Sequence, residues 1–564
     1  MFSFASIAGC ARTAPPAVDR VASEGRTASV PVVTAANPLA VDAGLAVLKR
    51  GGTAIDAAVA VQAMLGLVEP QSSGIGGGMF ILSFDAASRK ITFFNGRETA
   101  PAGATPDMFL DPATGKPLAR PVAMLSGRAT GVPGAIAALH AAHQAGGKLA
   151  WNSLFDDTIR TAEGGFQVSS RLAKFISGSS PQAKAEDVRA YFSMPDGRAM
   201  VAGDRLRNHA YAETLRAIAT QGPDAFYRGS IARAIVERVR RGALPGSMTE
   251  ADLASYKTDT DVPLCRPFRL VILCVPPPPS SGVGLLQLMA ILEDADIAST
   301  GPNDPRGWYL FAEASRIMYA DRDRYVGDPR FVTVPVAGLL APEYVRTRRA
   351  LIGDRAGPVP EAGVPEGAPA VGIDATQEPG GTTHFVIVDR AGNAVSITST
   401  VESFFGSGRM AAGFFLNNQL TDFSLSPLEH GRPAANAVAG GKRPRSSMAP
   451  VLVLHPDGSL MGALGSPGGN SIPAYVGKSL IGAFVWGLPL QEAFALPNLV
   501  ARGDRFDGEA DAFSPEVFKG LEARGVRVRA GAGEDSGLHG VLFRNGRVEA
   551  AADPRREGVA RTLR

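Results

Sequence analysis

The chain has 564 residues and, with 57 lysines and arginines against 54 aspartates and glutamates, a formal net charge of +3 at pH 7. Hydrophobic residues make up 45% and charged residues 20%, a balance typical of globular proteins and not of disordered chains. Because the charge excess is small and no run of five basic residues occurs, nucleic acid is not expected as a partner. Three cysteines and no Cys-x-x-Cys pattern give no support for a disulfide scaffold or a structural zinc site.

The first 29 residues are predicted to be the remnant of an export signal or a polar tether. Within them, Ile7-Ala8-Gly9-Cys10 resembles the lipobox at which bacterial lipoproteins are cleaved and acylated, so Cys10 is a candidate for a lipid anchor. No lysine or arginine precedes Cys10, and nine residues are too few for a complete signal peptide, which argues against this hypothesis. We expect a periplasmic or cell-envelope location, with a cytoplasmic one left open.

The first part of the folded chain is predicted to contain two helices and then two strands. Apolar spacing predicts a helix over 39–50, and the almost wholly apolar stretch 56–67 predicts a second, buried helix. A glycine-rich loop at 74–78 leads into predicted strands at 79–84 and 91–94. Because this loop precedes a strand instead of opening a helix, it is not expected to bind a nucleotide.

The middle of the chain, 123–345, is predicted to be mostly helical, with a clear helix at 283–292. Cys265 and Cys274 flank a strand-like run at 269–273, and they could form a disulfide in an oxidising compartment or remain buried thiols. No window of 18 uninterrupted apolar residues occurs, so the body of the protein is not expected to span a membrane.

Composition changes sharply before and after residue 382. Residues 356–381 contain five prolines and six glycines, which predicts a mobile linker. Alternating β-branched residues then predict a hairpin of strands 384–388 and 394–400. Further strands are predicted at 414–416, 451–454 and 460–464, followed by a helix at 472–485, and this order indicates a layered α/β sandwich.

The junction Gly381-Thr382 has the chemistry of a self-cleaving bond. A threonine hydroxyl can attack the preceding carbonyl if that peptide is strained, and the resulting ester is opened by water. Thr382 would then be a new N-terminus, whose α-amine, with a pKa of about 7.7 to 8.0, can act as the base for its own hydroxyl. The alternative reading is that two threonines simply begin a β-strand.

Motifs along most of the chain resemble those of the γ-glutamyltransferase (glutathione hydrolase) family. In the first half they are Asn37-Pro38-Leu39-Ala40, Gly51-Gly52-Thr53-Ala54, Gly74-Ile75-Gly76-Gly77-Gly78 and Arg97-Glu98-Thr99-Ala100-Pro101. In the second half they are Gly381-Thr382-Thr383-His384, Leu416-Asn417-Asn418-Gln419, Lys442-Arg443-Pro444, Ser446-Ser447-Met448 and Gly465-Ser466-Pro467-Gly468-Gly469. The resemblance implies an N-terminal-nucleophile hydrolase with an αββα sandwich, made as one precursor. It also implies a heterodimer of two interleaved subunits, large (30–381) and small (382–564), and no metal or other cofactor.

The resemblance also assigns roles to individual residues. Thr382 matches the nucleophile, and Thr400 matches the hydroxyl that orients it. Gly468 and Gly469 match the oxyanion hole, where amides before a helix favour negative charge. The family residues that bind the α-carboxylate of a γ-glutamyl amide are matched by Arg97, Ser446 and Ser447. Those that bind its α-ammonium are matched by Gln419 and Asp422.

Two departures from the family pattern make the substrate range uncertain. Many members carry an asparagine facing the α-amino group where this chain has Glu402, a carboxylate that could attract the ammonium or repel the substrate carboxylate. Only 24 positions separate Asp422 from Ser446, and no tyrosine lies between them, which predicts a short lid or none.

Three functions therefore remain as hypotheses. The leading one is an acyl-enzyme that passes a γ-glutamyl group to water or an amino acid, and the second is a cephalosporin (glutaryl) acylase with the same chemistry. The third is a catalytically inactive binding homologue. Serine-hydrolase and metalloprotease chemistry are not supported, because no G-x-S-x-G and no H-E-x-x-H pattern occurs.

Overall fold

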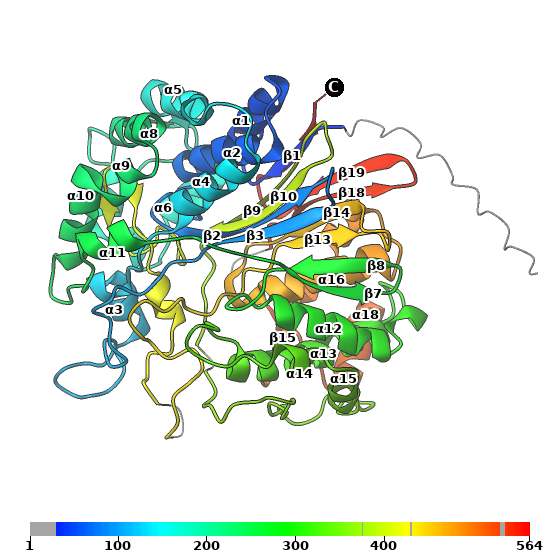
Figure 1. Ribbon diagram of the computed structural model, residues 1–564. Helices are drawn as coiled ribbons and strands as arrows, with labels where there is room; N and C mark the ends of the chain where they lie inside the picture. The colour runs from blue at the N-terminus through cyan, green and yellow to red at the C-terminus, as the bar shows by residue number, and fades with distance from the viewer. Residues whose placement is uncertain (1–29, 375, 429–430, 531–535, 564) are drawn as a thin grey trace, which may run out of the picture.

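Two antiparallel β-sheets lie face to face between two layers of helices in the computed structural model (Figure 1). The structure describes residues 30–374, 376–428, 431–530 and 536–563. The expected αββα sandwich is therefore confirmed. The predicted tether and the lipobox at Cys10 lie outside the described residues. Within the described ranges, no helix is long and apolar enough to cross a membrane.

The first sheet has seven strands and carries the predicted hairpin at its centre. In spatial order the strands are β20 (Val559–Thr562), β1 (Val32–Ala35), β9 (Thr382–Val388), β10 (Ala394–Thr400), β2 (Gly78–Asp85), β3 (Lys90–Gly96) and β6 (Asp259–Asp261).

The second sheet has six strands, again all antiparallel. Their order is β19 (Arg547–Ala552), β18 (His539–Arg544), β14 (Leu460–Gly465), β13 (Val451–Leu454), β8 (Val271–Val275) and β7 (Leu264–Phe268). Small sheets outside the sandwich comprise β4 (Phe166–Gln167) with β5 (Arg205–Leu206), β11 (Met410–Ala411) with β12 (Phe414–Phe415), and β15 (Leu499–Arg502), β16 (Arg505–Gly508) and β17 (Arg529–Ala530).

Two groups of helices flank the sandwich, and members of each group pack against the neighbouring sheet (Figure 1). The first group contains α1 (Pro38–Lys49), α2 (Ala54–Val68), α3 (Arg120–Leu125), α4 (Ala135–Gly146), α5 (Asp156–Gly164), α6 (Ser170–Ile176), α7 (Glu186–Tyr191), α8 (His209–Gln221), α9 (Asp224–Tyr227), α10 (Gly229–Arg240) and α11 (Glu250–Ser255). The second contains α12 (Gly282–Asp294), α13 (Pro305–Tyr325), α14 (Val336–Leu340), α15 (Pro342–Arg349), α16 (Ile472–Phe484), α17 (Leu490–Ala495) and α18 (Pro515–Ala523).

Strand β9 is buried on both faces, which fixes the start of the hairpin in the middle of the molecule. Because side chains alternate along a strand, Phe385 and Ile387 pack into the core under α1 and α2, while Val386 and Val388 pack into the core between the sheets. Thr382, at the start of β9, is buried as well.

Two expectations need correction. Residues 356–381 contain no helix or strand among those described, as expected, but the segment is held against α13: Tyr325 donates to the Gly363 carbonyl (2.6 Å) and Gly363 N–H donates to Asp321 (2.8 Å). Residues 356–381 therefore form a packed segment, called the strap below, and not a mobile linker.

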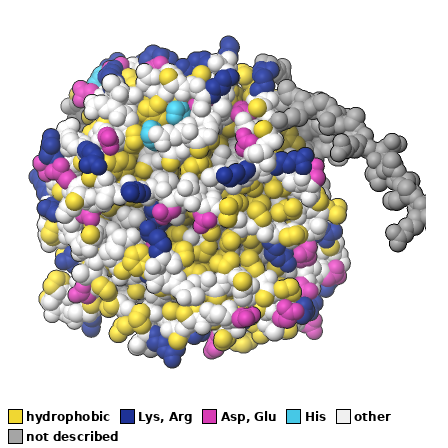
Figure 2. Space-filling view, in the orientation of Figure 1, with side chains coloured by type: hydrophobic (Ala, Val, Ile, Leu, Met, Phe, Trp, Pro, Cys, Tyr) yellow, Lys and Arg dark blue, Asp and Glu magenta, His cyan; other side chains and the backbone are white. Residues whose placement is uncertain are grey.

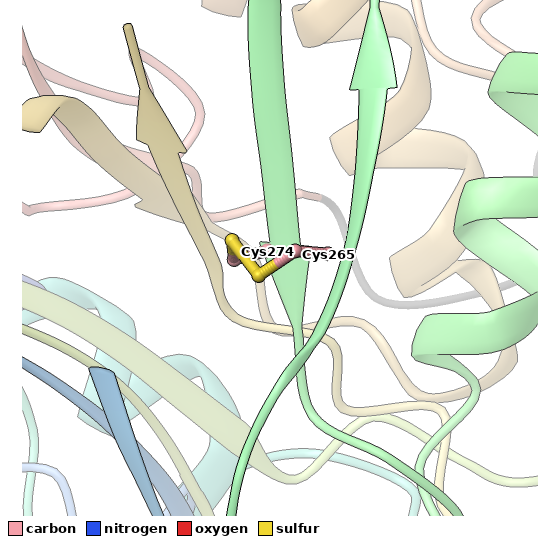
Figure 3. Close-up of a disulfide and its surroundings, with 2 residues drawn as sticks. All are labelled: Cys265 and Cys274. Atoms are coloured by element: carbon pink, nitrogen blue, oxygen red, sulfur yellow. A yellow bond between two sulfur atoms is a disulfide. The ribbon is translucent and has the colours of Figure 1, made fainter. Parts of the chain in front are cut away.

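The strand expected at 269–273 is displaced. Arg269 has a φ of 52° and lies in the turn of a hairpin, so that Cys265 on β7 stands opposite Cys274 on β8. The two cysteines form a disulfide (Figure 3). The sequence had left pairing open, and the structure decides it.

Candidate active site

The hairpin of β9 and β10 places the two expected catalytic threonines side by side. Thr400 is the residue opposite Thr382 in the register, and their Oγ1 atoms are 3.2 Å apart. The Thr400 hydroxyl donates to the Gly381 carbonyl (2.8 Å) and accepts from the Glu402 N–H (2.9 Å). Since the single proton of Thr400 is used on Gly381, the Thr382 hydroxyl donates to Thr400 and keeps its lone pairs for attack.

Gly381 is packed so tightly that only glycine fits. A Cβ at this position would overlap the backbone of Glu402 and Ser403. Glu402 itself has a φ of 79°, an uncommon conformation for a non-glycine residue. The bond between Gly381 and Thr382 therefore lies in a crowded place, with its carbonyl already held by a hydroxyl donor.

The loop from β14 to α16 carries the two glycines expected in the oxyanion hole. Gly468 and Gly469 have φ values of 134° and 54°, which favour glycine, and they come just before the N-terminus of α16. A Cβ on Gly469 would overlap the carbonyls of Glu378 and Pro379. The residues just before the expected cleavage site thus lie directly on this loop.

Arg97 and Gln419 both hold the Asp422 carboxylate. Arg97 Nη2 donates to Asp422 Oδ2 (2.6 Å), and so does Gln419 Nε2 (2.5 Å). Gln419 Oε1 is a buried acceptor that has no hydrogen-bond donor, whereas the Asp422 carboxylate also shares a hydrogen bond with the Glu402 carboxyl group. A buried carboxylate in contact with an amide whose oxygen has no donor fits an ammonium group. The Arg97 guanidinium, expected to face a substrate carboxylate, is occupied here by Asp422 and by the carbonyls of Pro444 and Arg445.

Glu402 is a buried carboxyl group beside a second one. Burial and the neighbouring Asp422 carboxylate raise the pKa of Glu402 well above its ordinary value, although Arg120, 3.3 Å away, opposes this. Burial also raises the pKa of Asp422, in part offset by Arg97. Glu402 is therefore the member of the pair that keeps its proton, and Asp422 carries the negative charge.

Ser446 and Ser447 are fixed by contacts with a proline-rich loop and with α13. The Ser281 N–H donates to the Ser446 carbonyl (2.7 Å), and Arg322 on α13 donates to the Ser447 hydroxyl (2.6 Å). The Ser447 N–H donates to the Glu378 carboxylate (2.9 Å). Arg322 and Glu378 were not expected at the site.

Most of the expected site residues line one cavity. Those that do are Arg97, Thr382, Thr400, Glu402, Gln419, Asp422, Ser446, Ser447 and Gly469. Gly468 and Gly381 adjoin it without lining it. Glu378 and Pro379 line it as well, and sequence reasoning missed them because they belong to the segment predicted as a linker. Arg445, which donates to Glu378, stands between the motifs Lys442-Arg443-Pro444 and Ser446-Ser447-Met448, so its position could have been noticed from the sequence.

Comparison with known proteins gives consistent matches. A model of the gamma-glutamyltranspeptidase family matches residues 40–563. The glutathione hydrolase proenzyme of Bacillus subtilis (strain 168) is 36% identical over 544 residues, 94% of this chain and 91% of that protein. The Acylase ACY 1 proenzyme of Pseudomonas sp. (strain SE83) is 34% identical over 560 residues, 97% of each chain. The crystal structure of cephalosporin acylase from Bacillus halodurans matches with a TM-score of 0.82 at 26% identity, covering 98% of this chain and 99% of that one.

Proposed function

Because the chain belongs to the gamma-glutamyltranspeptidase family, we propose that it is a precursor that cuts itself before Thr382 and then hydrolyses or transfers γ-glutamyl groups. The observation that carries the proposal is the contact of Thr382 with Thr400, whose hydroxyl also holds the Gly381 carbonyl. The Thr382 nucleophile, the Thr400 hydroxyl that accepts its hydrogen bond and the Gly381 carbonyl that it attacks thus lie together in the uncut chain.

In self-cleavage, Thr382 Oγ1 attacks the carbonyl carbon of Gly381, and its proton passes to the departing backbone nitrogen. The bond between Gly381 and that nitrogen breaks, which leaves an ester to the Thr382 side chain and a free α-amine. The hydrogen bond from Thr400 stabilises the negative oxygen that forms during attack. Water then hydrolyses the ester, and the products are a Gly381 carboxylate and the restored Thr382 hydroxyl.

In the mature enzyme, the α-amine of Thr382 takes the proton of its hydroxyl as the latter attacks the γ-carbonyl of a γ-glutamyl amide. The amine of the substrate leaves with that proton, and an acyl ester on Thr382 remains. Water or the amine of an amino acid then takes the acyl group. We assign stabilisation of the anionic intermediate to the loop of Gly468 and Gly469.

Substrate recognition follows from the polar groups of the cavity. The α-ammonium of the glutamyl group would pair with the Asp422 carboxylate and donate to Gln419 Oε1, a buried acceptor without a donor. Arg97, Ser446 and Ser447 are proposed to face the α-carboxylate, with Glu402 near the ammonium.

The test is the Thr382→Ala variant beside the unaltered protein. We expect the unaltered chain to yield two fragments, the smaller one of 183 residues beginning at Thr382, and to release p-nitroaniline from its γ-glutamyl derivative. Thr382→Ala should remain one chain and be inactive. Mass spectrometry that found an uncut chain in the active protein would refute the proposal.

A glutaryl acylase is the second candidate, favoured by the match to a cephalosporin acylase over nearly the whole chain. A glutaryl group has no α-ammonium, so it would leave Gln419 Oε1 without a partner, at a cost of about 1–3 kcal/mol for a buried group. Comparing kcat/KM for γ-glutamyl and glutaryl anilides separates the two functions, and we expect the γ-glutamyl compound to react faster.

We also propose that the protein works in the periplasm or cell envelope. The disulfide between Cys265 and Cys274 supports this, because disulfides persist mainly in oxidising compartments. Lipid attachment at Cys10 is a separate part of this proposal, and the mass of the N-terminal peptide would test it.

A further inference from the structure

The carboxylate of Glu378 lies in the cavity and is held there by three donors. Its Oε2 accepts from the Ser447 N–H (2.9 Å). Its Oε1 accepts from Arg322 Nη2 and from Arg445 Nε, the latter at 3.4 Å. Ser447 is a residue proposed to face the α-carboxylate of the substrate, so a carboxylate of this chain already occupies that place.

The backbone around Glu378 is docked as firmly as its side chain. The Asn470 N–H donates to the Glu378 carbonyl (3.0 Å), and the Glu378 N–H donates back to the Asn470 side chain. Gly469, just before Asn470, has no room for a Cβ beneath this segment. The segment therefore covers the proposed oxyanion loop while its side chain fills the carboxylate position.

Buried positive charge would be left behind if this segment withdrew. Arg322 and Arg445 are fully buried, and they belong to a cluster of three arginines and three carboxylates. Removing Glu378 leaves the cluster with one positive charge too many, and a buried charge without a partner is strongly unfavourable. The members of the cluster are Arg322, Arg445, Arg502, Asp323, Asp374 and Glu378.

We propose that Glu378 is an internal substrate mimic in the uncut chain, and that Arg322 and Arg445 are the side chains that select a substrate carboxylate after cleavage. Cutting before Thr382 frees the end of the segment, and a carboxylate of the γ-glutamyl substrate takes the place of Glu378. The inference rests on the proposed function, since it names what that site recognises. It adds two arginines that sequence reasoning did not place at the site.

The first experiment uses the uncut protein, so that it does not depend on activity. Three proteins are compared: Thr382→Ala alone, Thr382→Ala with Glu378→Ala, and Thr382→Ala with Glu366→Ala. The last is a control that removes an exposed carboxylate of the same strap. L-glutamate should raise the melting temperature of the Glu378→Ala protein by at least about 2 °C and leave the other two unchanged. L-isoglutamine, which has an uncharged amide in place of the α-carboxylate, should have no effect.

Equal shifts in all three proteins, or no shift in a Glu378→Ala protein with an intact circular dichroism spectrum, would overturn the inference. If Glu378→Ala does not fold, Glu378→Ser replaces it, because serine also vacates the place of the carboxylate and keeps a polar side chain. The same L-glutamate shift is then expected.

The second experiment uses the cleaved enzyme and the Arg445→Met and Arg445→Lys variants. For the γ-glutamyl anilide, Arg445→Met should raise KM about tenfold or more with little change in kcat. For the α-carboxamide analogue of that anilide KM should not change, and Arg445→Lys should restore part of the loss. An equal loss on both anilides would mean that Arg445 only supports the structure. If the cleaved, unaltered protein is inactive on the γ-glutamyl anilide, the proposed function fails, while the L-glutamate shift still tests the inference.

Discussion

Glu402 shows how the environment of a residue changes the meaning of a substitution. The sequence suggested a negative charge where many relatives carry an asparagine, and a repulsion of the substrate carboxylate was one expectation. In the structure, burial and Asp422 raise the pKa of Glu402 well above its ordinary value. A protonated carboxyl group is neutral and has one donor and one acceptor, so it resembles an amide. The departure from the family pattern is therefore smaller than the formal charge implies.

This protonation predicts a pH-dependent difference between the uncut Thr382→Ala protein and its Glu402→Gln derivative. Because the pKa of Glu402 is raised in the folded state, the folded state holds a proton that the unfolded state has lost. Glu402 therefore costs stability increasingly as the pH rises above the ordinary carboxyl pKa of the unfolded chain. Glutamine has no such proton to lose. The difference in the free energy of unfolding, derivative minus parent, should therefore increase by up to about 1.4 kcal/mol per pH unit. Urea unfolding at several pH values measures this difference.

Glu366→Gln serves as the control, because this carboxylate is exposed and its substitution should give a difference that is flat with pH. A flat difference for Glu402→Gln as well would show that Glu402 is ionised in the uncut chain.

At the scale of secondary structure, elements with local signals were predictable and strands with distant partners were not. The helix α1, with Asn37 as its N-cap and Pro38 in its first turn, and the hairpin β9–β10 each have a pattern complete within about twenty residues. Strand β1 is only four residues long and pairs with β9 and β20 from the other end of the chain. Such pairing is decided by tertiary contacts, which a local pattern does not contain.

The register of the β9–β10 hairpin leads to a prediction about Thr400. Thr400→Val keeps the branched shape and removes the hydroxyl that holds the Gly381 carbonyl, while Thr400→Ser keeps the hydroxyl. Since loss of one donor to a developing oxyanion costs about 10²–10³ in rate, we expect Thr400→Val to slow self-cleavage roughly a hundredfold. Thr400→Ser should cleave at a rate close to that of the unaltered chain.

The appearance of the 183-residue fragment on denaturing gels, followed over time in freshly purified protein, gives the rate. If Thr400→Val were cut as fast as Thr400→Ser, the hydroxyl would have no part in the cleavage.

At the scale of the whole molecule, the sequence motifs predicted the family and its layers, and they identified most of the cavity. They did not predict that Glu378 lines this cavity and pairs with Arg322 and Arg445. These three residues come from the strap, from α13 and from the segment before Ser446, and their ion pairs form only when the segments pack together. A buried network of this kind is a property of the tertiary structure: Arg445 stands beside a motif, but no local pattern marks Glu378 and Arg322 as its neighbours.

The arrangement of strands also predicts how the two fragments behave after cleavage. Residues before the cut supply β1, β2, β3 and β6 to the seven-stranded sheet, and residues after it supply β9, β10 and β20. Because β9 and β10 lie between β1 and β2, the two fragments share the main-chain hydrogen bonds on both sides of the central hairpin. Both fragments also contribute strands to the six-stranded sheet.

Separating the fragments would expose both buried cores, so we expect one complex of the two under native conditions and two bands only after denaturation. Size-exclusion chromatography of the cleaved protein, with each peak analysed on a denaturing gel, tests this. The uncut Thr382→Ala protein is the control and should elute at the same volume, because cleavage breaks one backbone bond and leaves the strand pairing unchanged. Elution of the 183-residue fragment on its own would contradict the interleaved arrangement, since strands paired within one sheet separate only if the sheet itself unfolds.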